Sequence, residues 1–160
     1  MPNHCENDLY IRGDKEDVDA LLSLVGAEGA KPKFDFNQLI PEPPDLPDDD
    51  NVKFAADGML AMPSWYTWRC EHWGTKWNAY EVVLDRSGDC TAVVHFETAW
   101  APPKPIFYAL AEKFPKLCLC LEYYERGMEF CGGIRRDAPE DADDNSAVEW
   151  QGDYKGLRGG

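Results

Sequence analysis

The residues best suited to chemistry gather in one short stretch, from position 68 to position 79. An acid, an imidazole and an amine lie there among tryptophans, as Glu71, His72 and Lys76. A few polar groups surrounded by large aromatic side chains are typical of ligand pockets. The sequence therefore offers a candidate pocket for ligand binding or catalysis. Its residues are Trp68, Glu71, His72, Trp73, Lys76, Trp77 and Trp100.

The cysteines offer a second candidate chemistry, because thiolates bind zinc. Cys118 and Cys120 alternate on one side of a predicted strand, and Cys5 is the third ligand of this metal hypothesis. Zinc usually takes four ligands in a tetrahedron, and the chain has no paired C-x-x-C motif. Cysteine also packs as a small apolar group. Buried thiols are therefore the favoured interpretation, and no metal or other cofactor is expected.

Motifs of known catalytic classes are missing from the sequence. It contains neither G-x-S-x-G nor G-x-x-x-x-G-K. Cys70 and His72 stand two positions apart, which on a helix points their side chains in different directions. The sequence therefore predicts a protein that is not an enzyme. The alternative is a small-ligand-binding or enzymatic domain that uses the Trp-lined pocket.

Acidic residues dominate the charge, with 30 Asp and Glu against 16 Lys and Arg and a net charge of −14. Such a surface repels nucleic acid and anionic membranes and attracts basic partners. Two acidic runs are candidates for imitating nucleic-acid phosphates and binding the arginines and lysines of a partner protein. Their residues are Asp45, Asp48, Asp49, Asp50, Glu140, Asp141, Asp143 and Asp144. The alternative is that both runs are solvated loops.

Apolar periodicity predicts the elements that must position these residues. Apolar residues alternate with polar ones in strands and recur at i, i+3, i+4 and i+7 in helices. The predicted strands cover residues 8–13, 80–86, 90–97, 117–124, 128–134 and 148–154, with a hairpin turn at 87–88. The predicted helices cover residues 14–25, 64–73 and 103–114.

The segment from residue 27 to residue 62 has a weak pattern. Four prolines between positions 41 and 47 rule out a helix or an inner strand there. We interpret residues 27–79 as an insertion that ends in the Trp-rich helix, with a further short helix near residues 51–56.

The order of strands and helices is that of a ferredoxin-like domain. This α+β fold is a split βαβ sandwich, an antiparallel sheet with two helices on one face. Residues 1–135 would form the domain, and residues 136–160 an acidic loop and a C-terminal edge segment. The residues expected to face the helices are Leu9, Ile11, Leu117, Leu119 and Leu121.

Five segments together resemble the YubB ferredoxin-like domain family, small proteins of bacteriophages, plasmids and bacterial genomes. They are residues 1–7, Phe-Asn-Gln-Leu-Ile-Pro at 36–41, Trp-Gly-Thr-Lys-Trp-Asn-Ala at 73–79, Phe-Glu-Thr-Ala-Trp-Ala-Pro-Pro at 96–103, and Tyr-Tyr-Glu-Arg-Gly-Met at 123–128. The resemblance implies a ferredoxin-like fold and a setting on mobile genetic elements. It transfers no catalytic roles.

These observations lead to one functional expectation. The protein is an accessory protein of a phage or other mobile element, and it binds a host protein that has a basic surface. In its most specific form it inhibits a bacterial defence system, as an anti-CRISPR protein does, through an acidic surface that mimics nucleic acid. Direct nucleic-acid binding and membrane association are not expected. A homodimer is compatible with the sequence, and the expected location is the cytoplasm of a bacterial host.

Overall fold

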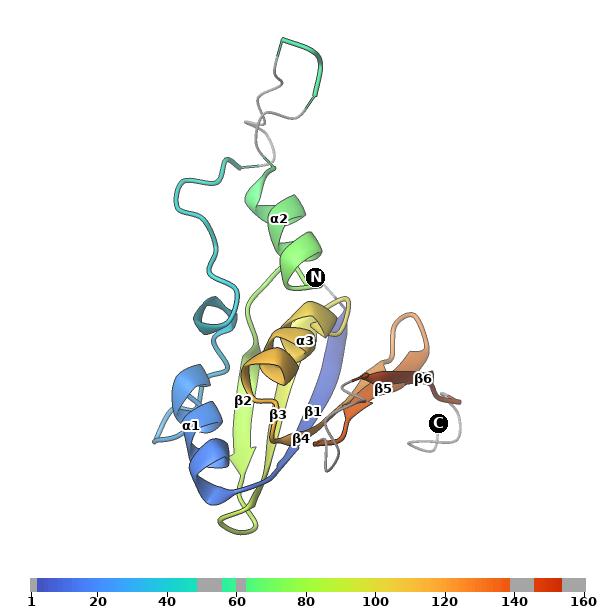
Figure 1. Cartoon of the computed structure of the whole chain (residues 1–160). Coiled ribbons are helices and arrows are strands. Elements are labelled where there is room, and N and C mark those ends of the chain that lie inside the picture. Colours follow the sequence, from blue (N-terminus) through green and yellow to red (C-terminus); the bar gives the residue numbers. More distant parts are fainter. Residues whose placement is uncertain (1–2, 49–55, 60–62, 139–145, 154–160) are drawn as a thin grey trace.

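The computed structural model describes residues 3–48, 56–59, 63–138 and 146–153 (Figure 1). Its elements in chain order are β1 (His4–Arg12), α1 (Lys15–Val25), the 3-10 helix η1 (Phe36–Gln38), α2 (Trp65–His72), β2 (Tyr80–Asp85), β3 (Thr91–Ala99), α3 (Lys104–Lys113), β4 (Cys118–Glu125), β5 (Phe130–Arg136) and β6 (Val148–Gln151). The predicted order of elements is confirmed. The short helix expected near residues 51–56 falls almost wholly outside the described residues.

One antiparallel sheet holds all the described strands, in the order β2-β3-β1-β4-β5-β6. The first four strands, with α1 and α3 as the connecting helices, form the split βαβ arrangement. The predicted ferredoxin-like α+β fold is therefore confirmed. β5 and β6 extend the sheet beyond β4, and α2 belongs to the insertion between α1 and β2 (Figure 1).

The core lies between the helices and one face of the sheet, which we call the helix-covered face. Leu9, Ile11, Leu117, Leu119 and Leu121 are all buried, as the alternation predicted. The apolar stripe of α1 and that of α3 join them in a single cluster. Each fully buried side chain of this kind contributes about 1.5–3 kcal/mol relative to an exposed one. The opposite face carries Tyr10, Arg12 and other polar residues, and we call it the open face.

β1 begins at His4, four residues before the predicted start. The apolar alternation is interrupted by Asn7, a polar residue that is 1% exposed on the helix-covered face. Its amide Nδ2 donates to the carbonyl of Cys5 at 2.8 Å and to Oγ1 of Thr98 at 2.9 Å. A buried amide is tolerated where its hydrogen bonds are satisfied. The strand therefore continues through a residue that the apolar pattern excludes.

The β2–β3 connection is wider than the predicted two-residue turn. It runs through residues 86–90, and Arg86 holds it together. The guanidinium donates to the carbonyls of Gly88 at 3.1 Å and Asp89 at 3.0 Å, and it pairs with Asp19 of α1 at 2.5 Å. A side chain thus replaces the backbone bonds of a tight turn and ties the loop to α1.

Arg136, at the end of β5, is almost fully buried, with 2% of its surface exposed. It donates to the carbonyl of Ala111, and also to those of Phe114 at 2.7 Å and Leu117 at 2.8 Å. The last carbonyls of a helix have no partner within the helix, and a cation suits that end. Arg136 therefore caps α3 from the neighbouring sheet.

Candidate functional site

The segments that carry the family resemblance meet at one end of the sheet, which we call the motif junction. We define it by residues 3–4, 35–42, 69–80, 97–104 and 124–128. Thr75 donates its hydroxyl to the carbonyl of Ala99 at 2.8 Å, and the amide of Trp100 donates to the carbonyl of Asn3 at 2.9 Å. The Asn3 side chain fills the space that a Cβ on Gly127 would need. Segments far apart in the sequence therefore form one packed unit.

Trp73 is the centre of the junction and is 1% exposed. Its indole Nε1 donates to the carbonyl of Ile40 at 2.9 Å. Its ring makes edge-on contacts with Phe36, at 5.8 Å between centroids, and with Trp68, at 5.7 Å. Such contacts add to the energy of burial. Trp73 therefore holds the segment before α2 against the end of that helix.

Gly74 ends α2 with a φ of 81°. A Cβ at this position would lie 2.9 Å from Cδ of Pro105 and 3.1 Å from the carbonyl oxygen of Pro102. Only glycine adopts this backbone conformation readily and leaves room for the start of α3. The Trp-Gly-Thr segment and the Pro-Pro segment are thus packed directly against each other.

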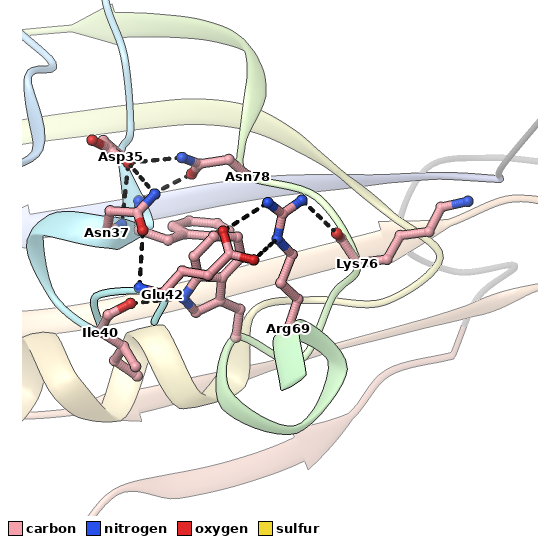
Figure 2. Close-up of polar contacts among 9 residues, drawn as sticks. Asp35, Asn37, Ile40, Glu42, Arg69, Lys76 and Asn78 are labelled. Carbon is pink, nitrogen blue, oxygen red and sulfur yellow. Dashed lines mark hydrogen bonds and ion pairs between the residues drawn. The ribbon is translucent and has the colours of Figure 1, made fainter. Parts of the chain in front are cut away.

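Arg69 and Glu42 form the charged part of the junction (Figure 2). Nε and Nη2 of Arg69 donate to the two carboxylate oxygens of Glu42 at 2.8 and 2.7 Å, a bidentate pair. The guanidinium also lies 5.1 Å from the ring centroids of both Trp65 and Trp73. A planar, partly buried pair of this kind fixes the relative position of α2 and the segment before it better than an exposed ion pair would.

Asp35 and Asn78 form the polar part, which is also drawn in Figure 2. Nδ2 of Asn78 donates to Asp35 at 2.7 Å, and its Oδ1 accepts from the amide of Phe36 at 3.0 Å. Asp35 also caps η1 by accepting from the amide of Asn37 at 3.1 Å. Burial alone would raise the pKa of Asp35, but the hydrogen bonds from Asn78, Gln38 and Asn37 outweigh it and lower that pKa.

Asn78→Ala is expected to lower the free energy of unfolding by about 1–3 kcal/mol, because it removes the acceptor of the partly buried Phe36 amide and one of the hydrogen bonds to Asp35. Urea denaturation measures the loss. Since the folded pKa of Asp35 is lowered, its bonds stabilise the fold above the unfolded pKa, and this stabilisation is lost as the pH falls through the folded pKa. The difference between variant and wild type should therefore shrink in acid.

Gln38→Ala is the matched control for this prediction. Gln38 donates one exposed hydrogen bond to the same carboxylate at 3.2 Å. Its loss should change the free energy of unfolding by less than about 0.5 kcal/mol, as is usual for surface substitutions. Equal losses in the two variants would contradict the role assigned to Asn78.

The structure divides the candidate Trp-lined pocket into an interior and a surface group. Trp68 and Trp73 are buried in the core, whereas Glu71 and His72 are exposed on α2. The ring of His72 stacks on Trp68 at 4.3 Å, and its Nδ1 is 2.9 Å from the carbonyl oxygen of Trp68. These contacts give His72 a packing role against its own helix.

The rest of that candidate pocket forms an exposed aromatic edge, which we define as Lys76, Trp77 and Trp100. The Lys76 ammonium lies 4.4 Å from the ring centroid of Trp77 and 5.9 Å from that of Trp100. Trp77 is 39% exposed and Trp100 is 42% exposed. Partly exposed tryptophans supply large contact areas at protein interfaces.

Next to this edge, carboxylates gather on the open face. Glu6, Asp8, Glu81 and Glu97 line an open depression of about 410 Å³, and we call this set the acidic sheet face. The nearby basic groups are His4, 3.0 Å from Glu97, His95, 2.7 Å from Asp8, and Arg126, 3.7 Å from Glu6. The two histidines carry charge only when protonated. The depression is therefore an acidic surface of strands β1, β2 and β3.

Sequence reasoning did not group these four acids. Glu6 and Asp8 stand at alternate positions of β1, and the strand register places Glu97 opposite Glu6. The alternation of acids along β1 was a usable signal in the sequence. The sequence does not reveal the register between β1 and β3, which brings Glu97 to the same site.

The predicted acidic runs are described only in part. Asp45 and Asp48 are exposed in the segment before α2. The other six residues, Asp49, Asp50, Glu140, Asp141, Asp143 and Asp144, lie outside the described residues.

The three thiols of the metal hypothesis do not come together. Cys5 lies on the helix-covered face, whereas Cys118 and Cys120 lie on the open face opposite Arg12 and Tyr10. Burial raises the pKa of Cys5 to about 12 and that of Cys120 to about 11. Over the described ranges, no three Cys, His, Asp or Glu side chains are grouped as metal ligands would be.

Within the part of the chain that the structure describes, none of the helices has the length and apolar character needed to cross a bilayer.

Comparison with known proteins supports the fold reached from the sequence. The family model described as "Ferredoxin-like domain in Api92-like protein" matches residues 72–153. The uncharacterized protein YubB of Escherichia coli strain K12 is 34% identical over 80 residues, which are 49% of this chain and 55% of that relative. A crystal structure of a protein api92 from Yersinia pseudotuberculosis has a TM-score of 0.65 at 10% identity, covering 94% of this chain and 98% of the other. At that identity the structural likeness concerns the fold alone.

Proposed function

We propose that this chain is a non-enzymatic binding protein. It belongs to the family described as "Ferredoxin-like domain in Api92-like protein", and the proposal proceeds from that membership. Its partner is a host protein with a basic surface. The observation that carries the proposal is the position of the acidic sheet face beside an exposed aromatic edge.

The two surfaces are linked by a chain of contacts. The rings of Trp77 and Tyr80 make an edge-on contact at 6.4 Å. The hydroxyl of Tyr80 is 2.9 Å from Nδ1 of His4, and the same nitrogen is 3.0 Å from Glu97. A partner that covers the aromatic edge would therefore also meet the carboxylates. Interfaces commonly combine aromatic anchors with complementary charge at their borders.

The charge of the acidic sheet face selects the chemistry of the partner. Its four carboxylates line one depression and offer paired acceptors for arginine and lysine side chains. The net charge of −14 adds long-range attraction toward a basic protein and repulsion of nucleic acid. A basic protein is therefore a better fit than DNA or RNA.

The most specific form of the proposal is competition with nucleic acid. A host protein that binds DNA or RNA presents arginines and lysines spaced for phosphates, and a row of carboxylates can occupy them. The resemblance to small proteins of phages and plasmids motivates a bacterial defence protein as the target. The acidic runs at 45–50 and 140–144 would add negative charge that attracts the same basic partner.

The test is capture of a partner from bacterial lysate, followed by competition with DNA for the captured protein. Between about 0.1 M and about 1 M salt the screening length falls from about 10 Å to about 3 Å. We expect capture at low salt, loss of capture at high salt, and displacement of DNA from the partner. Capture that does not respond to salt would contradict the acidic form of the proposal.

A matched pair of double variants locates the surface. Glu81→Gln with Glu97→Gln neutralises two acids of the acidic sheet face, whereas Glu16→Gln with Glu112→Gln neutralises two exposed acids on α1 and α3. The first pair should reduce capture several-fold, and the second should leave it near the wild-type level, although the change in net charge is the same. Equal losses would show that only overall charge matters.

A further inference from the structure

A second depression on the open face has a different chemistry from the acidic sheet face. It has a volume of about 370 Å³ and lies at the opposite end of the central strand β1, where β1 ends and β3 and β4 begin. Ligand pockets commonly have volumes of about 300–1,000 Å³ and mix apolar walls with a few polar groups. We call it the Arg12 cavity.

Strand register builds the Arg12 cavity from two neighbouring rows of side chains. One row crosses the sheet through Val93, Tyr10, Cys120 and Arg135. The next row runs through Thr91, Arg12 and Cys118. Side chains directly opposite each other in antiparallel strands lie about 4.5–5.5 Å apart. The rows therefore give an apolar and aromatic floor, with Arg12 in the second row and Arg135, which pairs with Asp137, at the β5 end of the first.

Arg12 differs from the other described arginines in its contacts. Arg69, Arg86, Arg126 and Arg135 each pair with a carboxylate, and Arg136 donates to backbone carbonyls. Within the described residues, the contact recorded for Arg12 is a long one, 3.9 Å from Nη2 to Sγ of Cys118. Arg12 therefore has no carboxylate partner among the described residues, and a guanidinium of this kind in the wall of a cavity can bind an anion.

The thiols of Cys118 and Cys120 form part of the wall of this cavity. Burial raises the pKa of Cys120 to about 11, which keeps the thiol protonated near neutral pH. Sγ of Cys118 accepts a hydrogen bond from the amide of Ala138 at 3.3 Å. Both sulfur atoms are therefore part of the surface that a ligand in this cavity would contact.

We propose that the Arg12 cavity binds a small ligand made of a planar aromatic ring and one anionic group. The ring would stack on Tyr10, which is 41% exposed, against Val93 and Cys120. The anionic group, a carboxylate or a phosphate, would accept two hydrogen bonds from Arg12. Nucleoside monophosphates and aromatic carboxylic acids share this chemistry. The ligand site is separate from the partner surface and does not depend on it.

The test is a titration of the isotope-labelled protein, followed through the amide resonances of Thr91 and Val93. The probes are AMP and UMP in one arm, and benzoate and indole-3-carboxylate in the other. Adenosine and benzamide serve as uncharged analogues. We expect at least one anionic probe to saturate these resonances with a dissociation constant of about 1 mM or tighter, and its uncharged analogue to bind at least about 10-fold more weakly.

Two substitutions test whether Arg12 and Tyr10 contribute to binding of the probes. Arg12→Gln should weaken the anionic probe about 10-fold or more, and Tyr10→Leu should weaken both the probe and its analogue. Arg126→Gln is the matched control, because it removes the same charge from a side chain that is 73% exposed and lies outside the cavity wall. It should leave probe binding unchanged.

Three results would overturn the proposal. They are the absence of saturable shifts for every probe up to roughly 5 mM, equal binding of charged and uncharged analogues, and equal weakening by Arg12→Gln and Arg126→Gln. None of them bears on partner capture, because the partner assay uses variants of the acidic sheet face.

Discussion

Trp73→Ala is expected to lower the free energy of unfolding by roughly 3–5 kcal/mol, the range for truncating a large buried aromatic side chain. Natural domains have only about 5–15 kcal/mol of stability in total. The variant should therefore be partly or wholly unfolded at moderate temperature. Urea denaturation followed by circular dichroism measures the loss.

The expected effect is large because Trp73 has several roles at once. Its ring fills the centre of the motif junction, between Phe36 and Trp68. Its Nε1 satisfies the carbonyl of Ile40, which Trp73→Ala would leave without this donor. The same ring faces the guanidinium of Arg69. Removing it opens a cavity and loosens the Arg69–Glu42 pair together.

Two further substitutions separate these roles. Trp73→Phe keeps an aromatic ring but loses the Nε1 donor and part of the volume, so it should destabilise less than Trp73→Ala. Trp77→Ala removes a tryptophan that is 39% exposed and should cost about 1 kcal/mol or less. If Trp73→Ala stays folded with wild-type stability and loses only partner or ligand binding, the junction is a binding site and not a structural joint.

Arg136→Met is the second substitution with a large expected effect, a loss of roughly 2–4 kcal/mol. Methionine replaces much of the apolar stem but removes every hydrogen bond to the carbonyls of Ala111, Phe114 and Leu117. Each buried group left unsatisfied costs about 1–3 kcal/mol, and partial rearrangement at the end of α3 reduces the sum. Thermal or urea unfolding provides the measurement.

The neighbouring arginine supplies the matched control. Arg135 projects from the open face, with 59% of its side chain exposed, and pairs with Asp137. Arg135→Gln should change stability by less than about 1 kcal/mol, because exposed ion pairs contribute little. Arg136→Lys should lie between the two, since one ammonium cannot reproduce the fork that reaches three carbonyls. Similar losses for Arg135→Gln and Arg136→Met would argue against the capping role.

The fold could be predicted from the sequence because local patterns define it. Leu9 and Ile11 alternate with polar residues, and Val18, Leu21 and Val25 repeat with the helical period. These patterns predict element types and inward faces without knowledge of pairing. The fold class follows from the order of the elements.

The candidate sites were less predictable, because they depend on contacts between distant segments. Asp35 and Asn78 are 43 positions apart, and Glu42 and Arg69 are 27 apart. The one local signal was Asp35, an acid just before Phe36, which is typical of a cap. The only difference between the buried Arg136 and the exposed Arg135 in the sequence is their position in β5, where successive side chains point to opposite faces of the sheet.

The central place of β1 has a consequence for how the chain reaches this fold. Asn7 on β1 meets Thr98 on β3 across 91 positions, and Arg12 meets Cys118 on β4 across 106 positions. The chain loses the entropy of closing a long loop before such pairings contribute favourable free energy. Folds dominated by these pairings therefore form slowly. The β2–β3 hairpin is local and can form early. β1 is synthesised before β3 and β4, but it must wait for both of these strands before both of its edges are paired.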